Sequence, residues 1–302
     1  LGIMFMIMGV FSLGVNDILV KGLSYKFPIW EIVFFRALSG VIISIILIFI
    51  FGVSKLKTKK PLAHAIRAFS SVGCVVLFFF GIKFLLLSEN QAIFQSSPII
   101  AAILAAIILK EKIGLHRMLA VILGFVGAII ILKPGTELFK IYSLIPVASA
   151  FFMAFSYLST RYLMSTESSI SIIFYYSFAL LFASLIFFPK NFIIPDFYEL
   201  LPLMLLGIFG SIGHYFLSQA AKNAEVVVIT PFEYTSFIFV SFLGYIFYQE
   251  IPDVTIYIGA VFIFISGFYI IYREQQNKKN KFFLFKNTSV QQADTTKKAP
   301  TI

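Results

Sequence analysis

The chain has 302 residues, of which 60% are hydrophobic and 13% are charged, and its formal net charge is +10. Soluble domains are closer to half apolar and a quarter charged, so this composition excludes an ordinary water-soluble fold and indicates an all-α integral membrane protein. The positive charge comes partly from residues 274–302, which predict a basic, disordered cytoplasmic tail beside anionic lipid headgroups rather than a surface that binds nucleic acid.

Long apolar runs, separated by Gly, Pro or charged residues, divide the rest of the chain into predicted membrane spans. Each run has about 17 to 25 residues, which is the length that a helix needs to cross a hydrocarbon core of roughly 30 Å. Lys and Arg are more frequent in the loops on the side of the N-terminus, so we expect both termini in the cytoplasm. The ten predicted spans are 2–21, 29–51, 63–84, 90–109, 116–133, 141–162, 170–189, 200–221, 225–248 and 254–272.

The first two predicted spans contain charged residues at unusual depth. Asp17 and Lys21 are one helical turn apart on one face, so a local ion pair and a cavity wall are both open interpretations. Lys21 is also close enough to the membrane face to serve as an anchor. Arg36 lies about 10 Å inside its span at 1.5 Å per residue. A charge near the bilayer centre costs about 2.5–3.5 kcal/mol, so Arg36 needs a partner on another helix, and Asp17 is a candidate.

The fourth predicted span contains Pro98, which removes one backbone donor and predicts a break in the helix. Gln95 and Gln91 lie one and two turns before this proline. The carbonyl groups that a broken helix leaves free are available to a ligand or to neighbouring side chains. We therefore expect this span to border a binding cavity.

The ninth predicted span repeats this arrangement with Pro231, which is followed by Glu233 and Tyr234. Glu233 is interpreted as a cavity residue, with an internal salt bridge as the alternative. Tyr234 is an aromatic residue that could stack on a planar cargo or simply pack in the core. His214, in the middle of the eighth span, is either a proton carrier or a hydrogen-bonded interior residue.

Two alignments of the chain with itself indicate an internal duplication. A shift of 139 residues places "SSPIIAAILAAIILKEK" over "YTSFIFVSFLGYIFYQEI" and Glu111 over Glu250. A shift of 140 residues places Lys21 over Arg161, each a base near the end of the first span of its half. A unit of five spans is odd, so the second copy must be inverted relative to the first. The predicted fold is ten transmembrane helices in two inverted five-helix repeats (5+5), at 1–138 and 139–273.

Four segments carry a resemblance to a known family: "NDILVKGL", "WEIVFFRALSG", "SSPIIAAILAAIILKEKIGLHRMLAVILGFVGAII" and "TPFEYTSFIFVSFLGYIFYQEIPDVTIYIGAVFIFISGFYIIYRE". They resemble the EamA-type branch of the drug/metabolite transporter superfamily, including its S-adenosylmethionine and riboflavin-type carriers. The resemblance covers residues 1–273. It implies a central cavity and the movement of small metabolites by alternating access without ATP hydrolysis.

These observations predict a secondary transporter, not an enzyme, in the bacterial cytoplasmic (inner) membrane. Its cargo is expected to be a small amphoteric or anionic metabolite, derived from an amino acid or nucleoside-like. A coupled proton, a counter-substrate and a homodimer are left open, and the sequence shows no motif for a nucleotide, metal or other cofactor. The alternatives are a polytopic enzyme acting on lipid and a membrane subunit that does not transport. The predicted substrate-binding residues are Asp17, Lys21, Arg36, Gln91, Gln95, Arg161, His214, Glu233 and Tyr234, with Pro98 and Pro231 as structural breaks.

Overall fold

The computed structural model describes residues 1–56, 58–108, 115–133, 140–163, 167–188, 191–223, 229–270, 272–273 and 276. All regular structure in these ranges is helical, which confirms the predicted all-α class. The 3-10 helices are η1 (Val53–Leu56), η2 (Ile141–Ser143) and η3 (Thr230–Tyr234). The α-helices are α1 (Gly2–Leu23), α2 (Ile29–Phe51), α3 (Pro61–Phe84), α4 (Leu87–Phe94), α5 (Ser97–Ile108), α6 (Leu115–Leu132), α7 (Leu144–Leu163), α8 (Ser169–Ile186), α9 (Phe197–Asn223), α11 (Thr235–Tyr248) and the helix Val254–Ile270.

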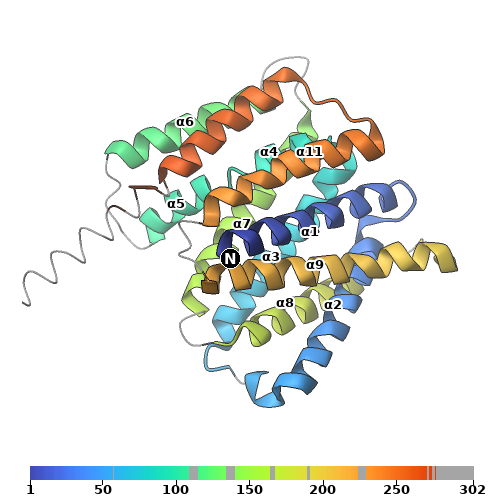
Figure 1. Cartoon of the computed structure of the whole chain (residues 1–302). Coiled ribbons are helices and arrows are strands. Elements are labelled where there is room, and N and C mark those ends of the chain that lie inside the picture. Colours follow the sequence, from blue (N-terminus) through green and yellow to red (C-terminus); the bar gives the residue numbers. More distant parts are fainter. Residues whose placement is uncertain are drawn as a thin grey trace, which may run out of the picture.

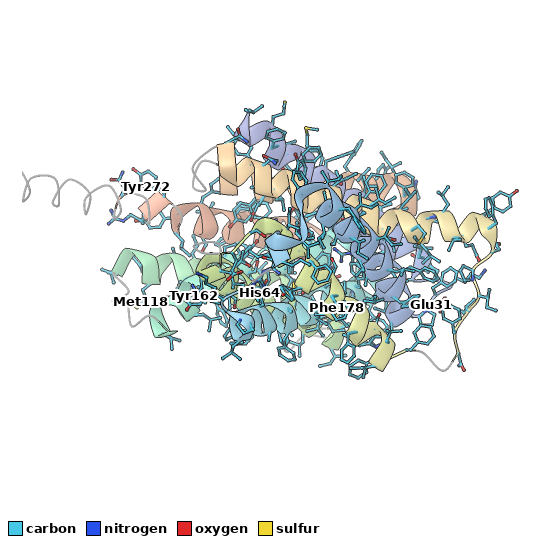
Figure 2. The ribbon with its side chains drawn as sticks, turned by 90° about the horizontal axis from the view of Figure 1, so that it is seen from below. Glu31, His64, Met118, Tyr162, Phe178 and Tyr272 are labelled. Carbon is cyan, nitrogen blue, oxygen red and sulfur yellow. The ribbon has the colours of Figure 1, made fainter. Side chains whose placement is uncertain are left out.

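Several of these helices have the length and composition of membrane spans. Five segments are both long and apolar enough to cross a bilayer, and they lie in α1, α2, α3, α7 and α9. Shorter apolar helices include Met118–Leu132, Ile170–Ile186 and Val254–Ile270. Large apolar side chains such as Met118 and Phe178 lie on the outside of the bundle (Figure 2). The protein therefore presents an apolar surface, as a chain surrounded by lipid must.

The helix ends follow from local sequence. Pro61 occupies the first position of α3, where a backbone N–H group would have no acceptor within the helix, so its absence in proline costs no hydrogen bond. Gly52 ends α2 with a φ of 92°, a conformation that glycine adopts without steric cost. The fourth predicted span is divided, because α4 ends at Phe94 and α5 begins at Ser97. Pro98 is thus the second residue of α5, where a proline is tolerated.

The helices pack in pairs that join the two ends of the chain. In Figure 1, α1 lies beside α9, and α6 lies beside the helix Val254–Ile270. Other extensive pairs are α3 with α7 and α2 with both α8 and α9, while α11 contacts α1 and α4. Sequentially distant segments are therefore neighbours throughout the bundle. The centre of the molecule is bordered by helices from both halves of the chain.

Small residues and uncharged hydrogen bonds hold these pairs together. A Cβ atom on Gly127 would come within 2.6 Å of the carbonyl oxygen of Gly259, so the two backbones touch. Ser12 donates to the carbonyl oxygen of Phe209 at 2.8 Å, which joins α1 to α9. Ser149 donates to the carbonyl oxygen of Cys74 at 2.8 Å, which joins α7 to α3. Such bonds satisfy polar groups that lipid cannot satisfy.

Candidate functional site

Arg36 is the deepest cation of α2, two turns from the start of the helix. Arg36 is buried, and its guanidinium carbon lies 5.1 Å from the centre of the Phe79 ring. Gly210 of α9 faces it and leaves it room, since a Cβ atom there would lie 3.3 Å from two guanidinium nitrogens. Within the described part of the chain, no carboxylate lies within 4.0 Å of this guanidinium and no acceptor is hydrogen-bonded to it. Its N–H donors are therefore available to a ligand.

Two of the predicted residues belong to the surroundings of Arg36. The charge of Arg36 acts on the carboxyl group of Asp17 in α1. The charges of Arg36 and Arg67 both act on His214 of α9, whose ring meets the ring of Tyr176 edge to face at 6.1 Å. Helices from both halves thus contribute to one polar group around Arg36.

A second polar group forms where the two broken spans meet. Gln91 and Gln95 each donate to the hydroxyl oxygen of Ser236 at 2.7 Å. Gln95 also donates to the backbone carbonyl oxygen of Glu233 at 3.1 Å. The side-chain oxygen of Gln91 is buried and has no hydrogen-bond partner in the described structure. The break before Pro98 and the 3-10 turn η3 therefore face each other through polar contacts.

The carboxylate of Glu233 interacts with the hydroxyl group of Tyr157 on α7. No Lys, Arg or His of the described residues forms an ion pair with Glu233 within 4.0 Å. An acid that is held by a phenol rather than by a cation retains capacity for a positively charged ligand.

Arg67 and Tyr157 are site residues that the sequence analysis did not identify. Arg67 donates to the hydroxyl oxygen of Thr160 at 2.8 Å, and its guanidinium carbon lies 5.9 Å from the centre of the Tyr176 ring. It lies six residues inside α3, so the depth argument that selected Arg36 also applies to it. Tyr157 carries no comparable signal, because an aromatic residue in an apolar span is ordinary.

The remaining predicted residues lie elsewhere. Tyr234 packs its ring against Phe264 and Phe268, and its hydroxyl group fills the space beside Gly267, so it supports helix packing. Lys21 lies at the far end of α1 in an ion pair with Glu250, away from both central groups. The side chains of Arg161 and Pro231 lie outside the described residues.

Ion pairs are also present at the ends of the helices. Lys26 pairs with Glu199, and Lys133 pairs with Asp253. The hydrogen bond from the Lys133 ammonium group holds the pKa of the Asp253 carboxyl group below its usual value. Both pairs are partly exposed and contribute little to stability. In contrast, the side chains of Asp17, Arg36, Arg67 and Glu233 lie inside the bundle, so the interior contains both basic and acidic groups.

Comparison with known proteins places the chain among transporters. The model of the EamA-like transporter family matches residues 1–133 and 140–272. The S-adenosylmethionine uptake transporter of Rickettsia prowazekii (strain Madrid E) is 26% identical over 280 residues, which cover 93% of this chain and 95% of that protein. The pseudopaline exporter CntI of Pseudomonas aeruginosa (strain UCBPP-PA14) is 26% identical over 270 residues, which cover 88% of this chain and 94% of the exporter.

A solved crystal structure shows the same fold, with a TM-score of 0.62 and 16% identity over 89% of this chain and 95% of that chain. The two family matches together span most of the chain, and they confirm the resemblance seen in the sequence. Both named relatives are transporters of small molecules. The chain therefore belongs to the EamA-like transporter family and is a multi-pass membrane transporter of a small molecule.

Proposed function

We propose that the protein is a secondary transporter of the bacterial inner membrane that moves a small amphoteric metabolite by alternating access. The observation that carries this proposal is the buried guanidinium of Arg36, which has no protein acceptor in the described structure and is bordered by helices from both halves. A buried cation is costly unless it faces a partner or water. An anionic group of the cargo would be that partner.

The pairing of the helices supports two inverted five-helix repeats. If the halves are related by a two-fold axis, each contact between two spans must recur between their counterparts, which lie five spans away in the chain. For this comparison, α4 and α5 together form the fourth span. The pair α1 and α9 then becomes α7 and α3, and the pair α2 and α9 becomes α8 and α3. The pair α1 and α11 becomes α7 with α4 and α5, while α2 with α8 and α4 with α11 are unchanged. All of these pairs are in contact, as a two-fold relation between the halves requires.

The chemistry of the site supports an amphoteric cargo. Arg36 would bind a carboxylate, and Glu233 would face an ammonium or sulfonium group or exchange a proton. S-adenosylmethionine, which is named for the Rickettsia relative, carries a carboxylate, an ammonium and a sulfonium group. We therefore take amino-acid-derived or nucleoside-like compounds as the cargo class, and we place both termini in the cytoplasm.

The test is transport by the purified chain alone in proteoliposomes. Radiolabelled S-adenosylmethionine and a panel of amino acids, nucleosides and their derivatives are each offered outside vesicles that contain the same unlabelled compound. We expect exchange of at least one amphoteric compound, and we expect that compound to raise the melting temperature of the detergent-solubilised protein. Chemical conversion of a lipid or a metabolite without exchange would favour a membrane enzyme. If no compound is bound or exchanged, the result would favour a subunit that does not transport.

Replacement of Glu233 by glutamine tests the cationic half of this site. It keeps the size of the side chain and removes the charge, so we expect binding of the transported compound to weaken by about thirtyfold, or about 2 kcal/mol. The thermal-shift titration measures this affinity. Glu199→Gln is the matched control, because Glu199 pairs with Lys26 at the end of the bundle. Equal affinities of the Glu233→Gln variant and the unsubstituted protein would remove Glu233 from the site.

A further inference from the structure

Lys21 and Glu250 form a buried polar cluster where α1 and α11 end. The Nζ atom of Lys21 lies 2.9 Å from Oε1 of Glu250 and donates to the carbonyl oxygen of Leu85 at 2.6 Å. The other carboxylate oxygen, Oε2, accepts the backbone N–H of Leu87 at 2.7 Å. The two charged side chains are only 7% and 9% exposed. We call Lys21, Leu85, Leu87 and Glu250 the outer latch.

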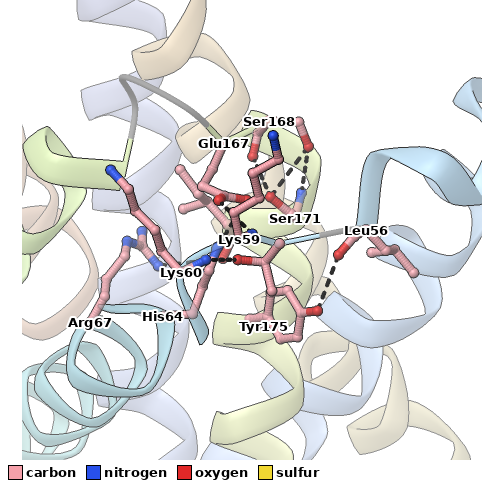
Figure 3. Close-up of polar contacts among 11 residues, drawn as sticks. Leu56, Lys59, Lys60, His64, Arg67, Glu167, Ser168, Ser171 and Tyr175 are labelled. Carbon is pink, nitrogen blue, oxygen red and sulfur yellow. Dashed lines mark hydrogen bonds and ion pairs between the residues drawn. The ribbon is translucent and has the colours of Figure 1, made fainter. Parts of the chain in front are cut away.

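A second cluster joins the start of α3 to the link between α7 and α8 (Figure 3). Oε1 of Glu167 accepts the backbone N–H of Lys59 at 3.1 Å, and its Oε2 lies 3.5 Å from Nε2 of His64. The side chains of His64 and Glu167 are 4% and 2% exposed. One turn further along α3, Arg67 donates to Thr160 at 2.8 Å. We call Lys59, His64 and Glu167 the inner latch.

The two latches have the same construction. In each, a glutamate from the second half of the chain receives a backbone N–H from the first half with one oxygen. Its other oxygen faces a basic side chain from the first half, Lys21 in one case and His64 in the other. Both glutamates therefore tie the second half of the chain to the first with both of their oxygens. Separation of the halves at either end requires that these contacts break.

The latches lie at opposite ends of the bundle. His64 and Leu85 are near the two ends of α3 and are 21 residues apart, or about 30 Å at 1.5 Å per residue. Arg36 packs on Phe79, which lies between His64 and Leu85 along α3, so the polar group around Arg36 lies between the two clusters.

A hollow at the surface reaches the outer latch. It has a volume of about 320 Å³, and Glu250 lines it together with Ser241, Tyr245 and Tyr257. The rest of its lining, Phe242, Ile251 and Pro252, is apolar, so Glu250 supplies the charged group at the edge of this hollow.

We propose that the outer latch and the inner latch are the two gates of the transport pathway, which open in turn to expose the central site. This proposal rests on the proposed function, because a gate has a role only if a cargo crosses the protein. Opening of the outer latch frees the end of α11 from α1 and from the link between α3 and α4. Opening of the inner latch frees the link between α7 and α8 from α3.

The test measures access to the centre from each side of the membrane. A cysteine is introduced at Ser236, in the Gln91–Gln95 contact, and Cys74 is replaced by serine. A membrane-impermeant maleimide is then applied to right-side-out and to inside-out vesicles. We expect Glu250→Gln to raise the labelling rate from the outside about tenfold and to leave the rate from the inside unchanged. We expect Glu167→Gln to raise only the rate from the inside.

Asp253→Asn is the matched control, since it breaks the exposed contact with Lys133 near the outer latch and should leave both rates unchanged. Labelling that rises equally from both sides, or that does not rise in either variant, would overturn the proposal. If Glu250→Gln raises labelling only from the inside and Glu167→Gln only from the outside, the latches are supported, and the chain has the opposite orientation to the one proposed. The assay needs no cargo, so sided labelling without any transport would reject the proposed function and retain the latches.

A cross-link distinguishes a gate from a structural tie. Cysteines replace both Lys21 and Glu250 in the Cys74→Ser background, and a bifunctional methanethiosulfonate reagent joins them. We expect the cross-linked protein to lose transport, to keep its melting temperature and to recover transport after reduction. Full transport in the cross-linked state would overturn the proposal, because a gate cannot remain closed during transport. This experiment also covers the case in which Glu250→Gln does not fold.

Discussion

Transport is expected to fall at least about a hundredfold when Arg36 is replaced by methionine, which corresponds to about 3 kcal/mol of lost interaction with the cargo. The guanidinium of Arg36 is buried against Phe79, and its donors have no acceptor among the described side chains. Methionine keeps the apolar stem and removes both the charge and the planar donors. The measurement is the initial rate of exchange in proteoliposomes, with thermal-shift titration as the second readout.

Three further variants separate the charge of Arg36 from its geometry and from folding. Arg36→Lys retains the charge and loses the planar donors, so we expect an intermediate loss. Gly210→Ala leaves the charge in place and pushes the guanidinium by a few tenths of an ångström, so we expect a smaller loss. The double variant Asp17→Asn with Arg36→Gln removes both ionisable side chains, and we expect it to fold and not to transport. Normal exchange by Arg36→Met would disprove the assignment of Arg36 to the site.

The free energy of unfolding is expected to fall by about 1–3 kcal/mol when Gly207 is replaced by alanine, and by more with valine. A Cβ atom at this position would lie 2.2 Å from the Cβ atom of Ser39 and 2.7 Å from the carbonyl oxygen of Arg36. Both atoms belong to the body of α2, which cannot move aside as the tip of a side chain can. The helices α2 and α9 must separate, and close contact is the main attraction between helices in lipid. The melting temperature in detergent reports the loss.

Gly14→Ala is the matched control for Gly207→Ala. A Cβ atom at Gly14 would lie 3.6 Å from the nearest atom of Val240, which is ordinary van der Waals contact. Alanine is favoured over glycine in a helix by up to about 1 kcal/mol, so this variant should be neutral or slightly more stable. If the two alanine variants melt at the same temperature, the contact between α2 and α9 is not as close as described.

The helical class could be predicted from the sequence because it depends on local properties. Hydropathy and run length decide whether a segment crosses a bilayer, and the predicted span 29–51 coincides with α2. The boundaries differ where the helix is broken. The predicted span 90–109 is occupied by α4 and α5, and α4 begins three residues earlier, at Leu87. Ser88 and Glu89 hid this start, because the predicted spans were bounded by charged residues.

The candidate site was only partly predictable for a physical reason. Its depth within a predicted span identifies Arg36 from the sequence, because a charged side chain inside a bilayer is costly unless it has a partner. The partners of such a residue come from helices far along the chain, and no local pattern reports them. Tyr157 meets Glu233, and Lys21 meets Glu250, only because the helices pack as they do. The sequence therefore identifies single deep residues of the site, but not the residues from other helices that contact them.

The helix α4 has a consequence for the biosynthesis of the protein. Its residues Leu87–Ile93 are all buried, and they include Ser88, Glu89, Asn90 and Gln91. Such a segment is a poor substrate for insertion into lipid by itself, because each polar residue near the centre opposes transfer from the translocon. The helices that surround it, α7 and α11, lie later in the chain and leave the ribosome after it. This segment must therefore wait at the translocon or the membrane surface until the second half arrives, so truncated nascent chains should expose it to proteases.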